Sequence, residues 1–103
     1  MTLISRRIRG EYTNHNPNDI NDFRQDQLDE CIAKDVSGYF VLGEGEAWIL
    51  LQGIEKDVQA VVDSIDNSNF LTNWVNQRTV HISNRDLDDV YLYYEDNTPM
   101  SSV

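Results

Sequence analysis

The spacing of hydrophobic residues changes along the chain, and each change predicts a different kind of element. In residues 3–12, apolar and polar residues roughly alternate, and Ile4 and Ile8 fall on one side of an extended chain. Alternation of this kind is typical of a β-strand with one buried face. We therefore predict a first strand over residues 3–12.

A helix is predicted from residue 17 to about residue 33, after a polar loop. Asn16 suits the N-cap position and Pro17 suits the first helical position. Apolar residues then recur three or four apart, which is the spacing of one helix face. The residues expected to face the core are Ile20, Phe23, Leu28, Cys31 and Ile32.

Two strongly apolar strands are predicted next, over residues 38–42 and 47–52. Glu44 and Gly45 lie between them and suit a tight hairpin turn. A second helix is predicted over residues 54–65, because its branched apolar residues recur at helical spacing. Its apolar stripe consists of Val58, Val61, Val62 and Ile65.

The rest of the chain is predicted to form a connector over residues 70–75 and two strands, over residues 78–83 and 89–94. The complete order, β-α-β-β-α-β-β, indicates an α+β fold. We predict a ferredoxin-like two-layer sandwich in which both helices cover one face of a mixed sheet. Residues 1–95 are expected to form this single domain, and residues 96–103 a flexible tail.

Both faces of the predicted hairpin are apolar, which is unusual for a sheet with helices on one side only. Tyr39 and Val41 alternate with Phe40 and Leu42, and the pattern leaves open which set faces the helices. Two helices cover one face, and large exposed apolar patches are rare on monomers. We therefore predict a protein partner or self-association at the second face. Its candidate residues are Tyr39, Val41, Trp48, Leu50, Tyr91 and Tyr93.

Charge and cysteine content narrow the possible roles. The chain has 18 acidic and 8 basic residues among 103, for a formal net charge of -10. Nucleic-acid binding is not expected, because phosphate contacts need clustered Lys and Arg. A membrane protein is not expected, because no run approaches the ~20 apolar residues of a span. Cys31 is the single cysteine, which rules out an internal disulfide and favours a cytoplasmic location.

No residue pattern points to catalysis or to a metal site. His15 and His81 have no cysteine or carboxylate at metal-ligand spacing. The carboxylate pairs fall in loops and at strand ends, where solvated acids are the rule, and we do not expect an enzyme. Arg6, Arg7 and Arg9 carry more information. Three roles are open for them: an anion site, ion pairs with acids on a neighbouring strand, or charges that keep an exposed edge strand from pairing with other chains.

Segments in the middle and at the end of the chain resemble the BLUF family, the flavin-binding domains that sense blue light. The matching segments are DVSGYFVL (35–42), AWILLQG (47–53), EKDVQAVVDSI (55–65) and NRDLDDVYLYY (84–94). The resemblance covers most of the chain in order and length. It implies a ferredoxin-like sensory domain and names FAD as the cofactor to consider.

The resemblance also implies which positions would contact the flavin. The family uses a tyrosine in the first strand, an asparagine late in the first helix and a glutamine in the third strand. The matching positions are Ser5, Cys31, and either Ile49 or Leu50. Gln52 stands where the family has a glutamate. Because apolar side chains cannot rearrange hydrogen bonds around a flavin, we expect these positions not to function as a cofactor site.

The leading hypothesis is a small cytoplasmic BLUF-like regulatory or interaction domain without bound flavin. A first alternative is an FAD-binding photoreceptor with an atypical pocket. A second is an acidic inhibitor whose carboxylates imitate the phosphates of nucleic acid. A small enzyme on the same scaffold is the least favoured alternative.

Overall fold

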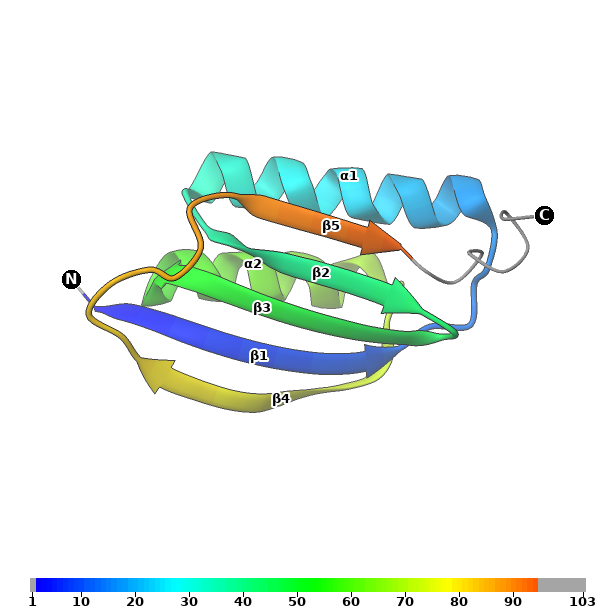
Figure 1. The fold of residues 1–103 in the computed structure, drawn as a ribbon. Helices are drawn as coiled ribbons and strands as arrows, with labels where there is room; N and C mark the ends of the chain where they lie inside the picture. Colours follow the sequence, from blue (N-terminus) through cyan, green and yellow to red (C-terminus); the bar gives the residue numbers. More distant parts are fainter. Residues whose placement is uncertain (1, 95–103) are drawn as a thin grey trace.

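The computed structural model describes residues 2–94, which form five strands and two helices (Figure 1). The elements are β1 (Leu3–Glu11), α1 (Pro17–Lys34), β2 (Ser37–Gly43), β3 (Glu46–Ile54), α2 (Glu55–Ser68), β4 (Thr72–His81) and β5 (Val90–Tyr94). This order confirms the predicted one. The predicted tail, residues 96–103, lies outside the described residues, and the domain boundary at residue 95 stays a prediction.

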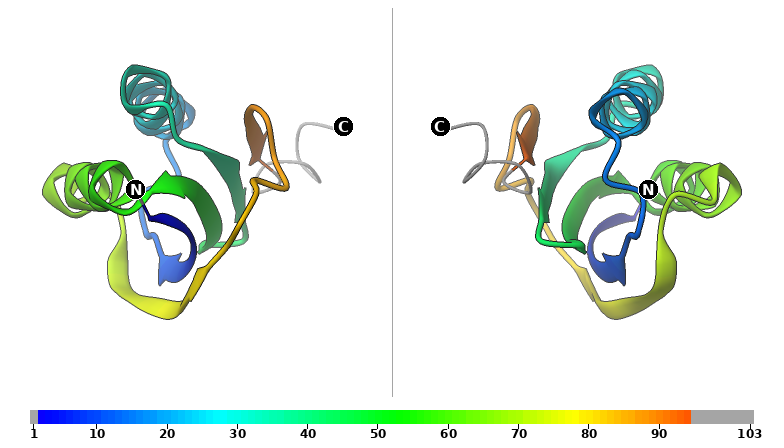
Figure 2. Two further views of the ribbon diagram at one scale, coloured as in Figure 1. Left: turned by 90° about the vertical axis from the view of Figure 1, so that its left-hand side faces the viewer. Right: turned by 90° about the vertical axis from the view of Figure 1, so that its right-hand side faces the viewer.

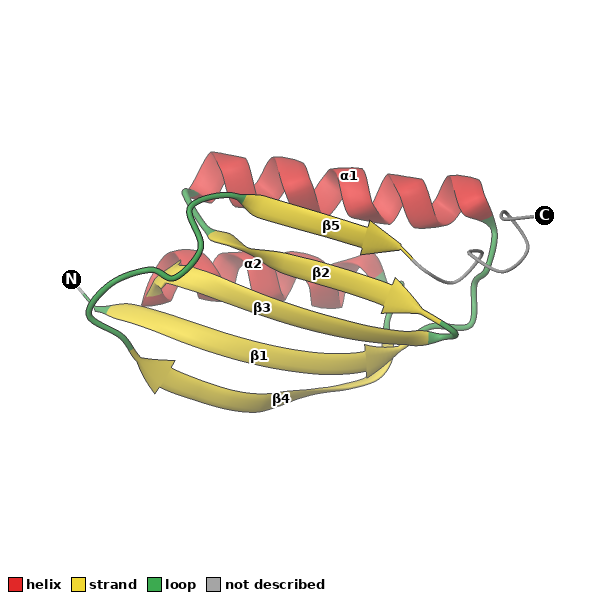
Figure 3. Cartoon of the chain, viewed as in Figure 1, coloured by secondary structure: helices red, strands yellow, loops and turns green. Residues whose placement is uncertain are grey.

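The five strands form one mixed sheet in the order β4-β1-β3-β2-β5. All neighbouring strands are antiparallel except β2 and β5, which run parallel. Both helices lie on the same face of the sheet, as the end-on views show (Figure 2). The secondary-structure view shows the β4–β5 loop crossing one end of the sheet (Figure 3). The predicted α+β sandwich, with helices on one face of a mixed sheet, is confirmed.

Helix α1 begins as predicted, and its buried face shares Ile20, Phe23 and Cys31 with the predicted one. The Asn16 side chain accepts hydrogen bonds from the backbone N–H groups of Asn18 and Asp19, which caps the helix. The buried residues are Ile20, Phe23, Gln27 and Cys31. Ile32 is 66% exposed, and its assignment to the core is wrong. It lies one residue beyond the stripe, about 100° further round the helix axis.

The central hairpin and helix α2 match their predictions. Glu44 and Gly45 have φ angles of 54° and 82°, as a two-residue type I′ turn requires. The apolar stripe of α2 is buried, with each side chain no more than 2% exposed: Val58, Val61, Val62 and Ile65. These four residues attach α2 to the sheet.

The core lies between the sheet and the helices. Alternate residues of the three central strands point into it, and they are the apolar set that includes Phe40 rather than Tyr39. The buried strand residues are Ile4, Ile8, Phe40, Leu42, Ala47, Ile49 and Leu51. Full burial of such side chains stabilises the fold by about 1.5–3 kcal/mol each. The complementary set, Tyr39, Val41, Trp48 and Leu50, lies on the face opposite the helices.

Strand β4 begins six residues earlier than predicted, because the segment expected to be a connector is part of it. Most of β4 is exposed, so its sequence carries no strict alternation of apolar and polar residues. Two register shifts against β1 also break the period. Trp74 folds back toward α2 and donates a hydrogen bond to Asp66. Gly10 leaves room for Trp74, because an added Cβ would lie 2.9 Å from the Trp74 Cβ.

Gly38 is the position in the sheet where a side chain fits least. A Cβ built there lies 1.9 Å from the carbonyl oxygen of Leu50, on the neighbouring strand. We expect Gly38→Ala to lower the free energy of unfolding by about 2 kcal/mol, because β2 and β3 must separate to admit the methyl group. Urea unfolding followed by circular dichroism measures this change. Gly53→Ala is the matched control, with its nearest contact at 3.3 Å. Equal losses for the two variants would contradict the expectation.

Candidate functional site

A buried glutamine fastens the β4–β5 loop to the sheet. Gln52 is 1% exposed, although it points to the face opposite the helices, between the helix-facing Leu51 and Gly53. Its side-chain Oε1 accepts hydrogen bonds from the backbone N–H groups of Asp86, at 2.9 Å, and Leu87, at 3.1 Å. The loop therefore covers Gln52 and closes one end of this sheet face.

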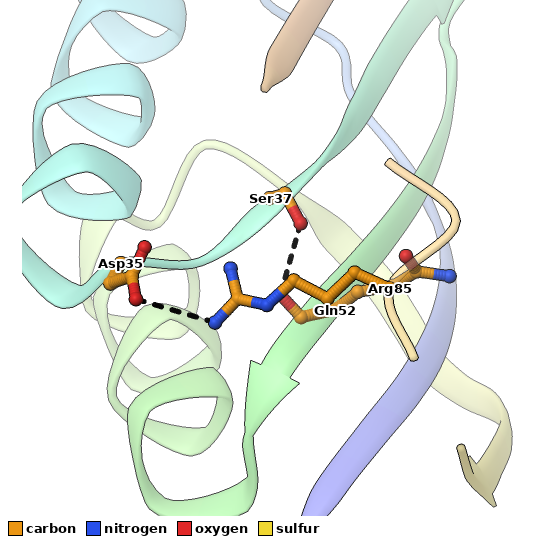
Figure 4. A network of polar contacts seen from close by, with 4 residues as sticks. All are labelled: Asp35, Ser37, Gln52 and Arg85. Atoms are coloured by element: carbon orange, nitrogen blue, oxygen red, sulfur yellow. Dashed lines mark hydrogen bonds and ion pairs between the residues drawn. The ribbon is translucent and has the colours of Figure 1, made fainter. Parts of the chain in front are cut away.

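Further polar contacts surround Gln52 (Figure 4). Ser37 Oγ lies 3.4 Å from the Gln52 backbone oxygen, and Arg85 forms an ion pair with Asp35 at 3.5 Å. The Nε2 of Gln52 lies 3.4 Å from Ser5 Oγ. These contacts hold the chain as it passes from β4 at one edge of the sheet to β5 at the other.

Beyond the loop, the face opposite the helices presents apolar side chains. Tyr39, Val41 and Leu50 are partly exposed, and Trp48 is 38% exposed. We call these four residues the open-face surface. The backbone of β5 places Tyr91 opposite Tyr39 and Tyr93 opposite Val41. The side chains of Tyr91 and Tyr93 lie outside what the structure describes.

Arginine side chains border the open-face surface. The Arg9 guanidinium lies 5.7 Å from the centre of the Trp48 ring, within cation–π range. Arg9 also forms an ion pair with Glu46, whose hydrogen bond and negative charge raise the pKa of Arg9. Arg9 is therefore held over the aromatic ring by a neighbouring carboxylate.

Arg7 and Arg78 form the other part of this border. They are directly opposite each other in the β1–β4 pair, and like charges so placed repel. Within residues 2–94, neither guanidinium has a hydrogen-bond or ion-pair partner. Together with Leu50 they line a shallow cavity of about 140 Å³, which Ser5 and Val80 complete. The arrangement suits a carboxylate or another anionic group.

The positions that the resemblance assigns to flavin do not converge. Cys31 and Ile49 are buried between α1 and the sheet, at 0% and 1% exposure. Ser5 and Leu50 lie on the opposite sheet face, where both line the cavity beside Arg7. A ligand held between α1 and the sheet could contact only the first two.

The helix-facing side of β1 and β3 is apolar except at Arg6. This side chain is 9% exposed and donates to Gln59 Oε1, at 2.6 Å, and to Thr79 Oγ1, at 3.2 Å. Arg6 shares the strand parity of Ile4 and Ile8, so its inward direction could have been predicted from the alternation. The sequence analysis instead treated Arg6 as one of three exposed arginines, together with Arg7 and Arg9.

Cys31 is a structural thiol in this arrangement. Burial, followed by the charge of Glu30, raises the pKa of the Cys31 thiol from 9.0 to about 12. The thiol therefore stays protonated at neutral pH, whereas the thiolate is the nucleophile and the metal ligand. Among residues 2–94, no three His, Cys, Asp or Glu side chains are grouped to hold a metal ion. Neither of the two helices in this range has the length and apolar character needed to span a bilayer.

Neither a family model nor a curated protein sequence matches the chain. Solved structures do match. BlrB, described as a BLUF protein in its dark state, superposes with a TM-score of 0.83 over 90% of this chain and 73% of its own, at 12% identity. A bacterial light-regulated adenylyl cyclase gives 0.82 over 97% of this chain and 32% of its own, at 14% identity. BlrP1 from Klebsiella pneumoniae gives 0.76, at 11% identity.

The chain has the fold of BLUF domains. This confirms, at the level of fold, the likeness predicted from the sequence. The chain spans about a third of the length of the light-regulated cyclase, and it covers most of the shorter BlrB. This chain therefore has the BLUF fold, with apolar side chains between α1 and the sheet and with Gln52 on the opposite sheet face.

The raised pKa of Cys31 makes stability depend on alkaline pH. The folded chain keeps the thiol proton above pH 9.0, whereas the unfolded chain releases it. The free energy of unfolding should therefore fall as the pH rises from 9.0. Urea unfolding of the parent and of Cys31→Ala over this range isolates the effect, because only the parent carries this group. Identical pH dependence in the two proteins would contradict the assignment.

Proposed function

We propose that this chain is a BLUF-fold interaction domain that works without bound flavin and binds a partner protein through its open-face surface. The observation that supports this most directly is an apolar surface next to two arginines, Arg7 and Arg78, that have no partner among the described residues. Burial of the apolar side chains drives association, and the arginines select the charge of the partner.

The proposal of a flavin-free domain rests on the chemistry of the layer between α1 and the sheet. A flavin ring needs hydrogen-bonding partners for its carbonyl groups and ring nitrogens. The side chains of Cys31 and Ile49 are in that layer and do not supply them. Two buried polar side chains lie nearby: Arg6, which is already bonded to Gln59 and Thr79, and Gln27 on the buried face of α1. Cys31 and Ile49 do not fit the cofactor, and a single amide does not replace the set of polar partners that the ring needs.

Purified protein is expected to be colourless and to stay so after refolding with excess FAD. The side chains of Cys31 and Ile49 offer no polar group to the flavin ring, so the cofactor should be lost on desalting. Visible absorption after desalting measures retention. Retained flavin absorption, with a reversible red shift under blue light, would establish instead the alternative of a photoreceptor with an atypical pocket.

The charge of the border favours a partner with acidic side chains around an apolar contact. Arg7 and Arg78 repel each other in the free protein, and a carboxylate between them removes that repulsion. Two copies stacked face to face would bring the same arginines together if the two-fold axis passed near them. We therefore propose a distinct acidic protein as the occupant of this surface. A second copy of the chain is the other occupant to test.

A peptide of alternating Glu and Leu is a suitable probe, with a Lys and Leu peptide as its control. The acidic peptide should shift backbone NMR signals around Leu50 and Trp48, and the basic one should not. Reversing both charges, in Arg7→Glu/Arg78→Glu, should weaken binding by about tenfold or more, since each arginine contributes a charge-assisted hydrogen bond.

Lys56→Glu makes the same kind of charge change on α2 and serves as the matched control. The proposal fails if this variant weakens binding as much as the arginine pair does. Sedimentation of the free protein at tens of micromolar tests whether a second copy of the chain occupies the open-face surface. A dimer that Leu50→Glu dissociates would identify a second copy of the chain as the partner.

The cytoplasmic location and the absence of catalysis belong to the same proposal. The thiol of Cys31 is free, buried and protonated, which suits the reducing conditions of the cytoplasm. Within the described residues, the open-face surface and the arginines beside it contain no nucleophile and base in contact. Such a surface can bind, position and release a partner, which is what a regulatory module requires.

A further inference from the structure

Strand β4 forms one edge of the sheet, and part of that edge is regular enough to pair with another chain. Among residues 2–94, β4 pairs with β1 alone (Figure 1). Two register shifts interrupt this pairing in the first part of β4, whereas residues 78–81 pair with residues 4–7 without interruption. A regular, exposed edge presents a row of backbone N–H and C=O groups to a further strand.

The outward-pointing backbone groups of this edge can be assigned from one hydrogen bond. The N–H of Ile82 donates to a backbone oxygen of β1 at 3.1 Å, so it points toward β1. Successive residues of a strand direct their N–H and C=O groups to opposite sides. The N–H groups of Arg78 and Val80 therefore also point toward β1, and those of Thr79 and His81 point away from it. Both Thr79 and His81 are exposed.

The side chains of the same segment place a positive charge beside the edge. Arg78 and Val80 lie on the sheet face opposite the helices, where they line the cavity shared with Arg7 and Leu50. Because the backbone of Arg78 is turned toward β1, an added antiparallel strand would meet Arg78 as a non-hydrogen-bonded pair, in which side chains are closest. The Cβ atoms of such a pair lie about 4.5–5.5 Å apart. A carboxylate on the facing residue would therefore reach the Arg78 guanidinium.

The composition of β4 distinguishes a strand from a second copy and a strand from a different protein. Thr72–His81 contains no aspartate or glutamate, although the chain has 18 acidic residues. In no register of two paired β4 strands would a carboxylate of either strand face Arg78. A neutral or basic strand leaves the repulsion between Arg7 and Arg78 in place, whereas an acidic strand removes it. Charge complementarity therefore favours an acidic segment of another protein.

From these observations we infer that the acidic partner contributes an extended segment that pairs with residues 78–81 as an additional strand of the sheet. Its backbone carbonyl groups accept hydrogen bonds from the N–H groups of Thr79 and His81. One of its carboxylates lies on the sheet face opposite the helices and contacts Arg7 and Arg78. This inference rests on the proposed function and specifies which part of the partner is bound.

Substitution of His81 tests this pairing, with the acidic peptide of alternating Glu and Leu as the probe. His81→Pro removes an outward N–H and keeps the pairing with β1, since proline is tolerated where the N–H of an edge strand faces solvent. It should weaken peptide binding by about tenfold, because a hydrogen bond is lost and the ring obstructs the added strand. His81→Ala keeps the N–H and is the matched control, with an expected change of no more than about twofold. Titrations followed by backbone NMR shifts measure both affinities.

Two N-methylated forms of the peptide test the same pairing on the parent protein, where no substitution can affect folding. One form carries methyl groups on the leucine nitrogens and the other on the glutamate nitrogens, so each form blocks one edge of the extended peptide. Only one edge of the peptide faces β4 in the inferred complex. One form should therefore bind about tenfold more weakly than the other, or weaker still.

The outcomes separate this inference from the proposed function. Equal binding by the two methylated forms, or by His81→Pro and His81→Ala, overturns the inference. If Arg7→Glu/Arg78→Glu still weakens binding in that case, the partner is held by side chains alone and the proposed function stands. Absence of peptide binding, or binding that this double variant does not change, overturns both. A dimer of the free protein that His81→Pro dissociates would identify a second copy as the added strand and overturn the acidic segment.

Discussion

Attachment of the β4–β5 loop to Gln52 is the constraint on which the sheet depends. The order β4-β1-β3-β2-β5 requires the chain to leave one edge and rejoin the sheet at the other. A connection of this length loses much conformational entropy, and it needs contacts along its path. The two backbone hydrogen bonds to Gln52 Oε1 and the ion pair of Arg85 with Asp35 supply them. Strand β5 and its parallel pairing with β2 follow from these contacts.

The two faces of the sheet have different roles because their side chains alternate in chemistry. On the helix side, the apolar residues of the three central strands fill the layer between the sheet and the helices. On the other side, apolar side chains combine with arginines and with a loop that closes one end. In the proposed function, the helix-side layer contributes stability and the opposite face contributes recognition.

Sequence reasoning succeeded for elements in which apolar residues recur at one regular spacing, and it failed where that spacing is interrupted. The stripe of α2 and the Glu44-Gly45 turn were predicted because their spacing and backbone preferences allow few alternatives. Strand β4 was placed too late, since it is exposed and has register shifts. Ile32 was assigned to the core because it is hydrophobic, whereas it is exposed and the polar Gln27 is buried. The contacts of Gln52 with residues 86 and 87 are long-range, and no local pattern encodes them.

The site was predictable in part for the same reason. The apolar set Tyr39, Val41, Trp48 and Leu50 follows from alternation alone, once one face is known to be covered. The approach of Arg7 to Arg78 could not be predicted, because it depends on the register between β1 and β4. The position of Ser5 relative to Cys31 likewise depends on which face each strand residue takes.

The facing arginines of β1 and β4 have a thermodynamic consequence for the edge of the sheet. Their repulsion opposes the pairing of the two strands, and within residues 2–94 the edge strand β4 pairs with β1 alone. An anionic group that neutralises this repulsion must, by linkage, strengthen strand pairing by the same free energy that it gains in affinity. Binding of an anionic group between Arg7 and Arg78 and pairing of β4 with β1 are therefore thermodynamically coupled. In the proposed complex, the order of strand β4 therefore increases when the partner binds.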